Sequence, residues 1–314
     1  MLCCTTKLKI YSKIVQSAEL IIRKIKEGDF QTIARALTQV ENQLPGADHL
    51  LRTLMPSQGT KVVGITGPPG AGKSTLVNAL LHLLIQKGLR MAVISVDPSS
   101  PFNLGSLLGD RIRMADYYLN PNVYIRSVAS RGSLGGLSAH IIEMLDVLKS
   151  ANFDYIFVET VGVGQSEVEI AGIADTTLVT LVPEAGDEIQ TMKAGLMEIA
   201  DIFIVNKGDR KNADDFVKNL KLLSHSKAGA WEIPVIKTIA SEEKGIEELV
   251  SAIENHQVFV QRNQDRKLEM YAMKAFQLIQ HKRMKDVGRN DLKNQIRRKL
   301  EVGDFNLYQF IADF

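Results

Sequence analysis

The sequence predicts an α/β fold, in which a mostly parallel, doubly wound sheet lies between helical extensions at both ends. Between residues 60 and 255, short apolar runs rich in β-branched residues alternate with helical patterns, and this alternation is typical of βαβ units. A glycine-rich run also follows the first apolar run, where a parallel strand would pass into a helix. We therefore expect an N-terminal helical segment over 1–55, an α/β domain over 56–255 and a C-terminal helical segment over 256–314.

The individual elements are expected in the following order. Residues 8–55 have helical patterns, broken near Gly28 and at Pro45-Gly46. Strands are expected at 61–66, 90–96, 123–126, 154–159, 176–182, 201–206 and 234–238, with helices near 73–87, 136–150, 188–199 and 212–224. Residues 257–301 carry no strand signal and predict one or two long helices, with Gly288 and Gly303 as breakers. The tail is strongly apolar and is expected to dock on its own domain or on a partner subunit, through Phe305, Leu307, Tyr308, Phe310, Ile311 and Phe314.

The composition is that of an ordinary globular protein and excludes several classes. Of 314 residues, 45% are hydrophobic and 24% are charged, and the net charge is only +2. This balance indicates neither a nucleic-acid partner nor an anionic membrane surface. Cys3 and Cys4 are adjacent, so they cannot form a disulfide framework, and a reducing cytoplasm is the expected compartment. No secretory signal is visible, and the most apolar stretch, 76–85, is too short for a bilayer.

The first helical segment allows two interpretations. Apolar residues between Ile14 and Ile25 are interspersed with Lys and Arg, as in a basic amphipathic helix on a membrane surface. The same pattern is also that of a helix with one face in the core and the other in solvent. We favour the second interpretation.

Residues 67–75 read G-P-P-G-A-G-K-S-T, which fits the phosphate-binding pattern G-x-x-x-x-G-K-[ST]. The expected strand 61–66 precedes this run and an expected helix follows it, which is the context that the motif requires. Lys73 is expected to reach the β- and γ-phosphates, and Ser74 to place its hydroxyl on Mg²⁺. A glycine turn that merely joins strand to helix is the alternative, and the complete motif disfavours it. We therefore predict a P-loop nucleotidase, with nucleotide bound by Gly67, Pro68, Pro69, Gly70, Ala71, Gly72, Lys73, Ser74 and Thr75.

Carboxylates follow the second strand and a later loop. Asp97 ends the run at the second strand and can serve Mg²⁺ or its waters, although such a residue can equally cap a helix. Asp110 is a second candidate metal ligand, and the adjacent Arg111 or the nearby Arg113 can pair with phosphate. A surface Asp-Arg pair of little energetic value is the alternative there.

The strand expected at 154–158 ends at Glu159 and continues into a glycine-rich loop. P-loop enzymes place the acidic metal-side residue and an amide that senses the γ-phosphate at this position. Gly162 can donate that amide, so the loop would order with triphosphate and relax with diphosphate. Gln165 can orient water, but a glutamine at a sheet edge is the simpler interpretation.

The run Asn206-Lys207-Gly208-Asp209 follows a late strand and matches N-K-x-D, the guanine-reading pattern. The carboxylate of Asp209 can accept from both the ring N–H and the exocyclic amine of guanine, which adenine does not offer. Lys207 can lie along the base, and Asn206 can join this loop to the phosphate loop. Four-residue patterns also occur by accident, but the position after a late strand favours the functional interpretation. Backbone amides after the last strand can meet the guanine carbonyl, in Ile239, Ala240 and Ser241.

One further segment, 184–193, follows a strand and opens a helix. Its spacing places Gln190 and Lys193 on one helix face, three residues apart. An ordinary helix capped by Asp187 is the alternative.

Together these motifs resemble the methylmalonyl-CoA mutase-associated GTPases, the MeaB/ArgK family of P-loop GTPases within the metal-insertion class. The resemblance covers about residues 50–255 clearly and rests on T-G-P-P-G-A-G-K-S-T, S-V-D-P-S-S, G-S-L-L-G-D-R-I-R-M, S-R-G-S-L-G-G, V-E-T-V-G-V-G-Q-S-E and A-G-D-E-I-Q-T-M-K-A-G. The fifth run is more specific to this family than the phosphate loop is.

The resemblance implies a role for each matched position. It implies that Lys73, Ser74 and Thr75 hold phosphate and Mg²⁺, that Asp97, Asp110 and Glu159 form the acidic metal side, and that Asn206, Lys207 and Asp209 read guanine. It implies that Asp187, Gln190 and Lys193 lie in the loop that couples a partner to GTP hydrolysis. Together with Lys73 and Glu159, these three residues are the candidate catalytic residues. Only the last base-reading segment, 239–241, matches the family loosely.

The resemblance also implies a function. The chain would be a cytoplasmic homodimer, joined through its C-terminal helices, that hydrolyses GTP to GDP and phosphate. It would act as a chaperone and switch for an adenosylcobalamin-dependent methylmalonyl-CoA mutase, in cofactor loading and protection. A metal-insertion GTPase is one alternative, disfavoured because Cys3 and Cys4 are the only cysteines and no histidine cluster accompanies them. A nucleotide-dependent kinase linked to arginine/ornithine transport is another, but the sequence shows no phosphate-accepting site.

Overall fold

The structure is a computed structural model that describes residues 19–97, 114–129, 137–138, 140–160, 169–186, 194–225, 231–284, 286–303 and 305–312. The chain divides into two compact units, residues 1–268 and residues 269–314. The boundary predicted between residues 255 and 256 falls inside a helix of the first unit, Ile246–Arg262 (α10). The functional division into three segments stays a prediction.

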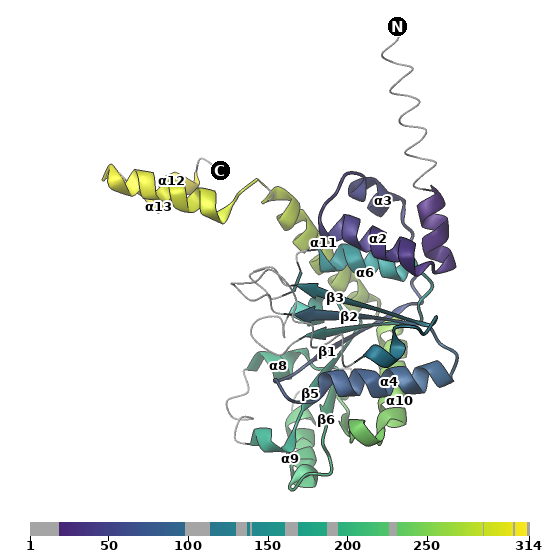
Figure 1. Cartoon of the computed structure of the whole chain (residues 1–314). Helices are drawn as coiled ribbons and strands as arrows, with labels where there is room; N and C mark the ends of the chain where they lie inside the picture. The colour runs from purple at the N-terminus through teal and green to yellow at the C-terminus, as the bar shows by residue number, and fades with distance from the viewer. Residues whose placement is uncertain are drawn as a thin grey trace. The chain divides into compact units, whose positions relative to one another are not determined.

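The first unit is built on a seven-stranded sheet in which every strand pairing is parallel. Each strand overlaps its predicted range, and the predicted parallel α/β fold is confirmed. The strands are β1 (Lys61–Thr66), β2 (Met91–Asp97), β3 (Val123–Ala129), β4 (Tyr155–Thr160), β5 (Thr176–Leu181), β6 (Ile202–Val205) and β7 (Val235–Lys237). Their order across the sheet is β3-β2-β4-β1-β5-β6-β7 (Figure 1), so β1 lies at the centre with β4 and β5 beside it.

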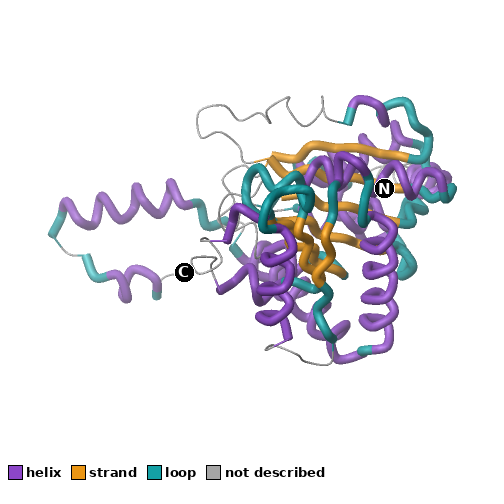
Figure 2. The backbone as a smooth tube through the Cα atoms, turned by 90° about the horizontal axis from the view of Figure 1, so that it is seen from below, coloured by secondary structure: helices purple, strands orange, loops and turns teal. Residues whose placement is uncertain are grey.

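Helices cover both faces of this sheet, as the continuous burial of β4 and β5 requires. They are α2 (Phe30–Glu41), α3 (Ala47–Thr53), α4 (Lys73–Gln86), α6 (Ile141–Lys149), α8 (Ala194–Ile199), α9 (Ala213–His225) and α10, with 3₁₀ turns η1 (Ala115–Tyr117), η2 (Ile170–Gly172), η3 (Pro183–Gly186) and η4 (Ala240–Glu242). Figure 2 shows the strands enclosed between helices.

The two faces of the sheet carry separate apolar cores. On one face, α4 and α10 pack on alternate residues of the strands, including Val63 and Ile65 of β1. On the opposite face, α9 covers Val179 and Phe203 beside the turn η2. Gly64 lets η2 approach β1 directly, since a Cβ there would lie 2.7 Å from Cγ1 of Ile170. The central strand is therefore held rigidly on both sides, which fixes the position of the loop that follows it.

The N-terminal helices belong to the first unit and do not form a separate surface helix. A helix over 19–27 ends at Gly28, and Asp29 then caps α2 by accepting from the amide of Thr32. The guanidinium of Arg126 on β3 bonds the carboxylate of Glu41 at 2.5 Å, and both side chains are largely buried. The rings of Phe30, Tyr124 and Phe153 pack together beside this pair. Of the described apolar residues between Ile14 and Ile25, Ile25 is fully buried and Leu20 is 46% exposed, so only part of this segment lies in the core.

The C-terminal unit consists of helices, as predicted. They are α11 (Gln264–Arg283), which begins in the first unit, α12 (Arg289–Glu301) and α13 (Leu307–Ile311), with Gly288 preceding α12. Phe310 is only 4% exposed and packs against the ring of Phe305 and the ammonium of Lys299. Leu307, Tyr308 and Ile311 remain exposed, so only part of the apolar tail docks within its own unit. No helix in the described ranges is both long enough and apolar enough to cross a bilayer.

Candidate functional site

The phosphate loop lies between the carboxyl end of β1 and the first turn of α4, as the motif predicts. Gly67, Gly70 and Gly72 all have positive φ, at 137°, 76° and 87°. Two of these glycines also have no room for a side chain. A Cβ at Gly67 would lie 2.1 Å from the carbonyl oxygen of Thr180, and one at Gly72 would lie 2.4 Å from Nδ2 of Asn206. The loop is therefore wedged between β5 and the loop after β6, and it can hold its shape without a ligand.

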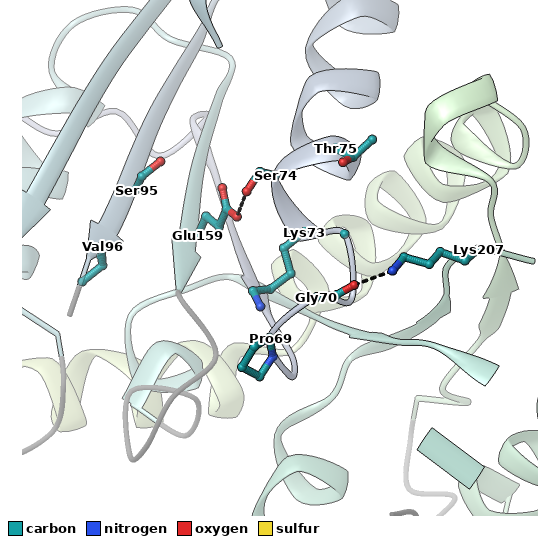
Figure 3. A pocket seen from close by; sticks show the side chains of 10 residues that line it. Pro69, Gly70, Lys73, Ser74, Thr75, Ser95, Val96, Glu159 and Lys207 are labelled. Carbon is teal, nitrogen blue, oxygen red and sulfur yellow. Dashed lines mark hydrogen bonds between the residues drawn. The ribbon is translucent and has the colours of Figure 1, made fainter. Parts of the chain in front are cut away.

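Lys73 occupies the centre of this loop and is 6% exposed. Its ammonium donates to the carbonyl oxygens of Gly67 at 2.8 Å and Pro68 at 3.0 Å. A buried ammonium is costly unless it is hydrogen-bonded, and these two carbonyls satisfy that requirement. The charge is thus held beside a cavity of about 440 Å³ (Figure 3), which is lined by Pro69, Gly70, Gly72, Lys73, Ser74, Thr75, Ser95, Val96, Glu159 and Lys207.

Ser74 and Glu159 meet at the floor of the same cavity. The hydroxyl of Ser74 donates to Oε1 of Glu159 at 2.6 Å, a short, charge-assisted bond, and Glu159 is 5% exposed (Figure 3). The contact forms because β4 lies next to β1 and both carboxyl ends reach the same edge of the sheet. A hydroxyl and a carboxylate are the hard oxygen ligands that Mg²⁺ prefers. This donor set therefore fits a magnesium ion, which Ser74 and Glu159 would hold.

The other candidate residues on this side are placed only in part. Asp97 ends β2, one strand away from β4, so its backbone lies at the same edge of the sheet as Glu159. Its side chain lies outside the described residues. So do five further candidates, namely Asp110, Gly162, Asp187, Gln190 and Lys193. Their proposed roles remain those implied by the resemblance.

Asn206 joins the base-reading loop to the phosphate loop. Its Nδ2 donates to the carbonyl oxygen of Ala71 at 2.9 Å. Its Oδ1 accepts from the hydroxyl of Thr238 at 3.2 Å and from the amide of Ala240 at 3.1 Å. Asn206 is 2% exposed, so all three bonds are shielded from water. The link between the two loops that the motif suggests is therefore present, and it extends to the segment after β7.

A second cavity of about 260 Å³ adjoins the first one. It is lined by Gly72, Thr75, Asn206, Lys207, Asp209, Arg210, Ile239, Ala240 and Ser241. Gly72, Thr75 and Lys207 line both cavities, so one nucleotide can extend from one cavity into the other. Asp209 is exposed at this second cavity, where its carboxylate can meet a base. The amide of Ala240 is engaged with Asn206, so in this structure Ala240 supports the loop and does not offer its amide to a base.

Three further features of the site come from the structure. Lys207 has a left-handed φ of 55° and its ammonium donates to the carbonyl oxygen of Gly70 at 2.7 Å. Arg210 bonds Glu184 of η3, and the backbone amide of Glu184 together with this guanidinium lowers the pKa of the Glu184 carboxyl. Ser95 of β2 lines the phosphate cavity. The two hydrogen bonds join residues that are far apart in the chain, so no local motif reports them.

Comparisons with known proteins agree with this geometry. Residues 33–292 match the family described as "Methylmalonyl Co-A mutase-associated GTPase MeaB". The chain is 48% identical over 249 residues to a Pyrococcus abyssi protein assigned as a GTPase, a match that covers 77% of each chain. It is 40% identical over 243 residues to the GTPase ArgK of Escherichia coli, covering 74% of this chain and 73% of that one. A solved structure of a LAO/AO transport system kinase superposes with a TM-score of 0.68 and 28% identity, covering 95% of this chain and 96% of that one.

The chain therefore belongs to the MeaB family of mutase-associated GTPases, as the sequence motifs predict. It is a GTPase with a P-loop that binds GTP and GDP.

Proposed function

We propose that this MeaB-family GTPase is a nucleotide-dependent switch and chaperone for an adenosylcobalamin-dependent methylmalonyl-CoA mutase, acting in cofactor loading and protection. The observation that carries the proposal is the family match over residues 33–292, whose description names association with that mutase. The chemistry of the site is consistent with such a role. A GTPase that serves as a timer needs a well-built nucleotide site, and the phosphate and base cavities share Gly72, Thr75 and Lys207.

In this proposal the base is selected by the loop after β6. The exposed carboxylate of Asp209 accepts from the ring N–H and the exocyclic amine of guanine, and adenine leaves that carboxylate unpaired. Lys207 lies along the base and keeps its contact with Gly70. Asn206 transmits the position of the base to the phosphate loop through Ala71.

The phosphates are held by the loop amides and by Lys73, which exchanges its carbonyl partners for phosphate oxygens and offsets the charge that develops on the γ-phosphate. Ser74 and Glu159, with Asp97 and Asp110 from the resemblance, would hold Mg²⁺, which when bound neutralises charge on the β- and γ-oxygens. Positioning and electrostatic stabilisation thus supply most of the catalysis. Hydrolysis then proceeds slowly until a partner completes the site.

Partner coupling is proposed to enter through the segment that follows β5. The turn η3 precedes the positions of Asp187, Gln190 and Lys193, and its Glu184 is bonded to Arg210, next to Asp209. A partner that moves this segment can therefore act on the base loop as well as on the phosphates. The resemblance suggests that Lys193 moves toward the phosphates when the partner binds.

The second unit is proposed to join two copies of the chain. Tyr271, Phe276 and Ile279 of α11 are 48%, 68% and 52% exposed, and large exposed apolar side chains of this kind are typical of subunit interfaces. A cytoplasmic homodimer is consistent with this surface. Light scattering on the purified protein would show twice the mass of 34.8 kDa if the proposal is right.

The function is tested by purification of the chain with a methylmalonyl-CoA mutase and measurement of GTP hydrolysis with and without it. We expect a complex whose stability depends on whether GDP or a non-hydrolysable GTP analogue is bound, and a faster hydrolysis rate in the complex. An adenosylcobalamin enzyme of a different reaction class serves as the control. A mutase that neither binds the chain in any nucleotide state nor changes its hydrolysis rate would refute the proposal.

The same assay can exclude a kinase. One relative is named a transport system kinase, so the assay should use GTP labelled at the γ-phosphate. Label that appears only in inorganic phosphate supports the switch. Label that appears on a protein or on a basic amino acid supports the kinase instead.

A further inference from the structure

Ser95 lies near the carboxyl end of β2 and is unlike its neighbours. The strand around it is apolar, with Val93, Ile94 and Val96 buried in the core. Ser95 is itself only 2% exposed, and its hydroxyl has no hydrogen-bond partner among the described residues. Most buried polar atoms in folded proteins have a partner, so an unpaired hydroxyl at this depth calls for an explanation.

The position of Ser95 supplies that explanation. β2 pairs with β4 in parallel, and Ser95 is the register partner of Glu159. Matched positions on parallel neighbours send their side chains to the same face of the sheet, so Ser95 and Glu159 share a face. Both side chains line the phosphate cavity together with Lys73 and Ser74. Figure 3 shows the hydroxyl of Ser95 on the side of β2 that faces Glu159.

The strand order decides what the hydroxyl can reach. β4 stands between β2 and β1, so Glu159 lies between Ser95 and the helix that carries Ser74. A metal ion held by Ser74 and Glu159 would therefore lie beyond direct reach of the short Ser95 side chain, and a water would have to join the two. Neighbouring strands lie about 4.8 Å apart, a spacing that suits one water molecule beside the short serine side chain. Mg²⁺ dehydrates reluctantly and usually keeps several waters in its shell.

We propose that Ser95 is a positioning residue that hydrogen-bonds a water of the Mg²⁺ hydration shell, on the β2 side of Glu159. The inference rests on the proposed magnesium-dependent GTP site and adds a role for the first residue of the run S-V-D-P-S-S, to which no role was assigned from the sequence. Among the described residues of the ligand-free protein the hydroxyl is buried without a partner, which destabilises the fold. In the nucleotide complex the hydroxyl gains its partner and stabilises the metal shell.

The test compares Ser95→Ala and Ser95→Thr with the parent chain. The control is Ser224→Ala, which removes a hydroxyl that is equally buried, at 2% exposed, but lies on α9 and donates to the carbonyl oxygen of Lys221. Three quantities are measured for each protein. They are the affinity of the GDP complex for Mn²⁺ by electron paramagnetic resonance, the affinity for fluorescent GDP in EDTA, and the melting temperature without nucleotide.

We expect Ser95→Ala to weaken Mn²⁺ binding by roughly 2- to 10-fold, the value of one hydrogen bond, and to leave GDP affinity in EDTA unchanged. Its ligand-free melting temperature should rise by about 2–6 °C, because an unpaired buried hydroxyl is removed. Ser95→Thr keeps the hydroxyl and should restore Mn²⁺ affinity. Ser224→Ala should lower the melting temperature and leave Mn²⁺ affinity unchanged.

Two results would overturn the proposal. Equal Mn²⁺ affinity in Ser95→Ala and the parent chain would show that the hydroxyl does not support the metal. An equal loss of GDP affinity with and without divalent ion would show that Ser95 acts on the nucleotide or on the fold. Failure of the parent chain to bind any guanine nucleotide is a separate result, and it would count against the proposed function itself.

Discussion

On the base side of the nucleotide site, both polar side-chain atoms of Asn206 are hydrogen-bonded within the protein, to Ala71, Thr238 and Ala240. On the phosphate side, the hydroxyl of Ser95 is equally buried but has no partner among the described residues. The hydrogen bonds that hold the base side are therefore made within the protein, whereas on the phosphate side a buried hydroxyl is left that a bound ligand can satisfy. This difference suggests that base recognition is preorganised, and that nucleotide and metal chiefly change the phosphate side.

Lys73→Ala is expected to have the largest effect, and it tests the phosphate side of the site. The substitution removes the only lysine of residues 67–75, whose charge is proposed to offset that of the γ-phosphate. We expect kcat for GTP hydrolysis to fall by about 10³-fold, as when a stabilising donor of a transition state is deleted. Steady-state phosphate release measures the rate, and Lys87→Ala, at the exposed far end of α4, is the control. A loss of less than about 10-fold would mean that the phosphate side does not depend on Lys73.

An intermediate effect is expected from Asp209→Asn, which alters the base side alone. The amide replaces one acceptor with a donor, so it clashes with the ring N–H or the amine of guanine but suits the extra oxygen of xanthine. We expect GTP affinity to fall by about 100-fold and xanthosine triphosphate to become the preferred nucleotide. Competition against fluorescent GDP measures both affinities. The control is Asp215→Asn on α9, an exposed carboxylate that lines neither cavity. Unchanged preference would remove Asp209 from the base site.

The smallest change in nucleotide affinity, but a clear loss of stability, is expected from Asn206→Ala. The substitution leaves the carbonyl of Ala71 and the amide of Ala240 without their partner at a buried site. The free energy of unfolding should fall by about 2–3 kcal/mol, and GDP affinity by about 10-fold because the base loop is no longer held in place. Urea unfolding and calorimetric titration measure the two quantities. If stability were unchanged, the base side would not be preorganised, and the contrast with Ser95 would lose its basis.

The sequence predicts most of the fold because the inner strands, such as β4, β5 and β6, are buried on both faces and their sequences are continuous apolar runs. The first strand, 61–66, is observed with the bounds expected, and all seven strands are found. The phosphate and base loops are equally predictable, since their glycines and their N-K-x-D pattern are local in the chain. One helix is expected to begin at residue 136, whereas the observed helix α6 begins at Ile141.

The remaining features depend on contacts between distant residues. Ser95 belongs to the run S-V-D-P-S-S, but only the register of the sheet shows that it lies opposite Glu159. The contact of Arg210 with Glu184 crosses 26 residues, and no period or motif relates them. The contact of Glu41 with Arg126 cannot be predicted from the sequence for the same reason, since the two residues are far apart in the chain. Tertiary packing, which a local pattern does not encode, decides these features.

The pair of Glu41 and Arg126 also has a consequence for folding of the chain during its synthesis on the ribosome. The two residues are separated by 85 positions in the chain, and Phe30 is separated from its stacking partner Phe153 by an even longer stretch. At typical rates of synthesis, α2 emerges about 4 to 17 s before Arg126. The helix α6, on which α2 packs, is translated later still, so the apolar residues Ile33, Leu37 and Val40 lack that cover in the interval. The nascent chain therefore offers a transient binding site for cellular folding factors, and that site closes only after α6 has been translated.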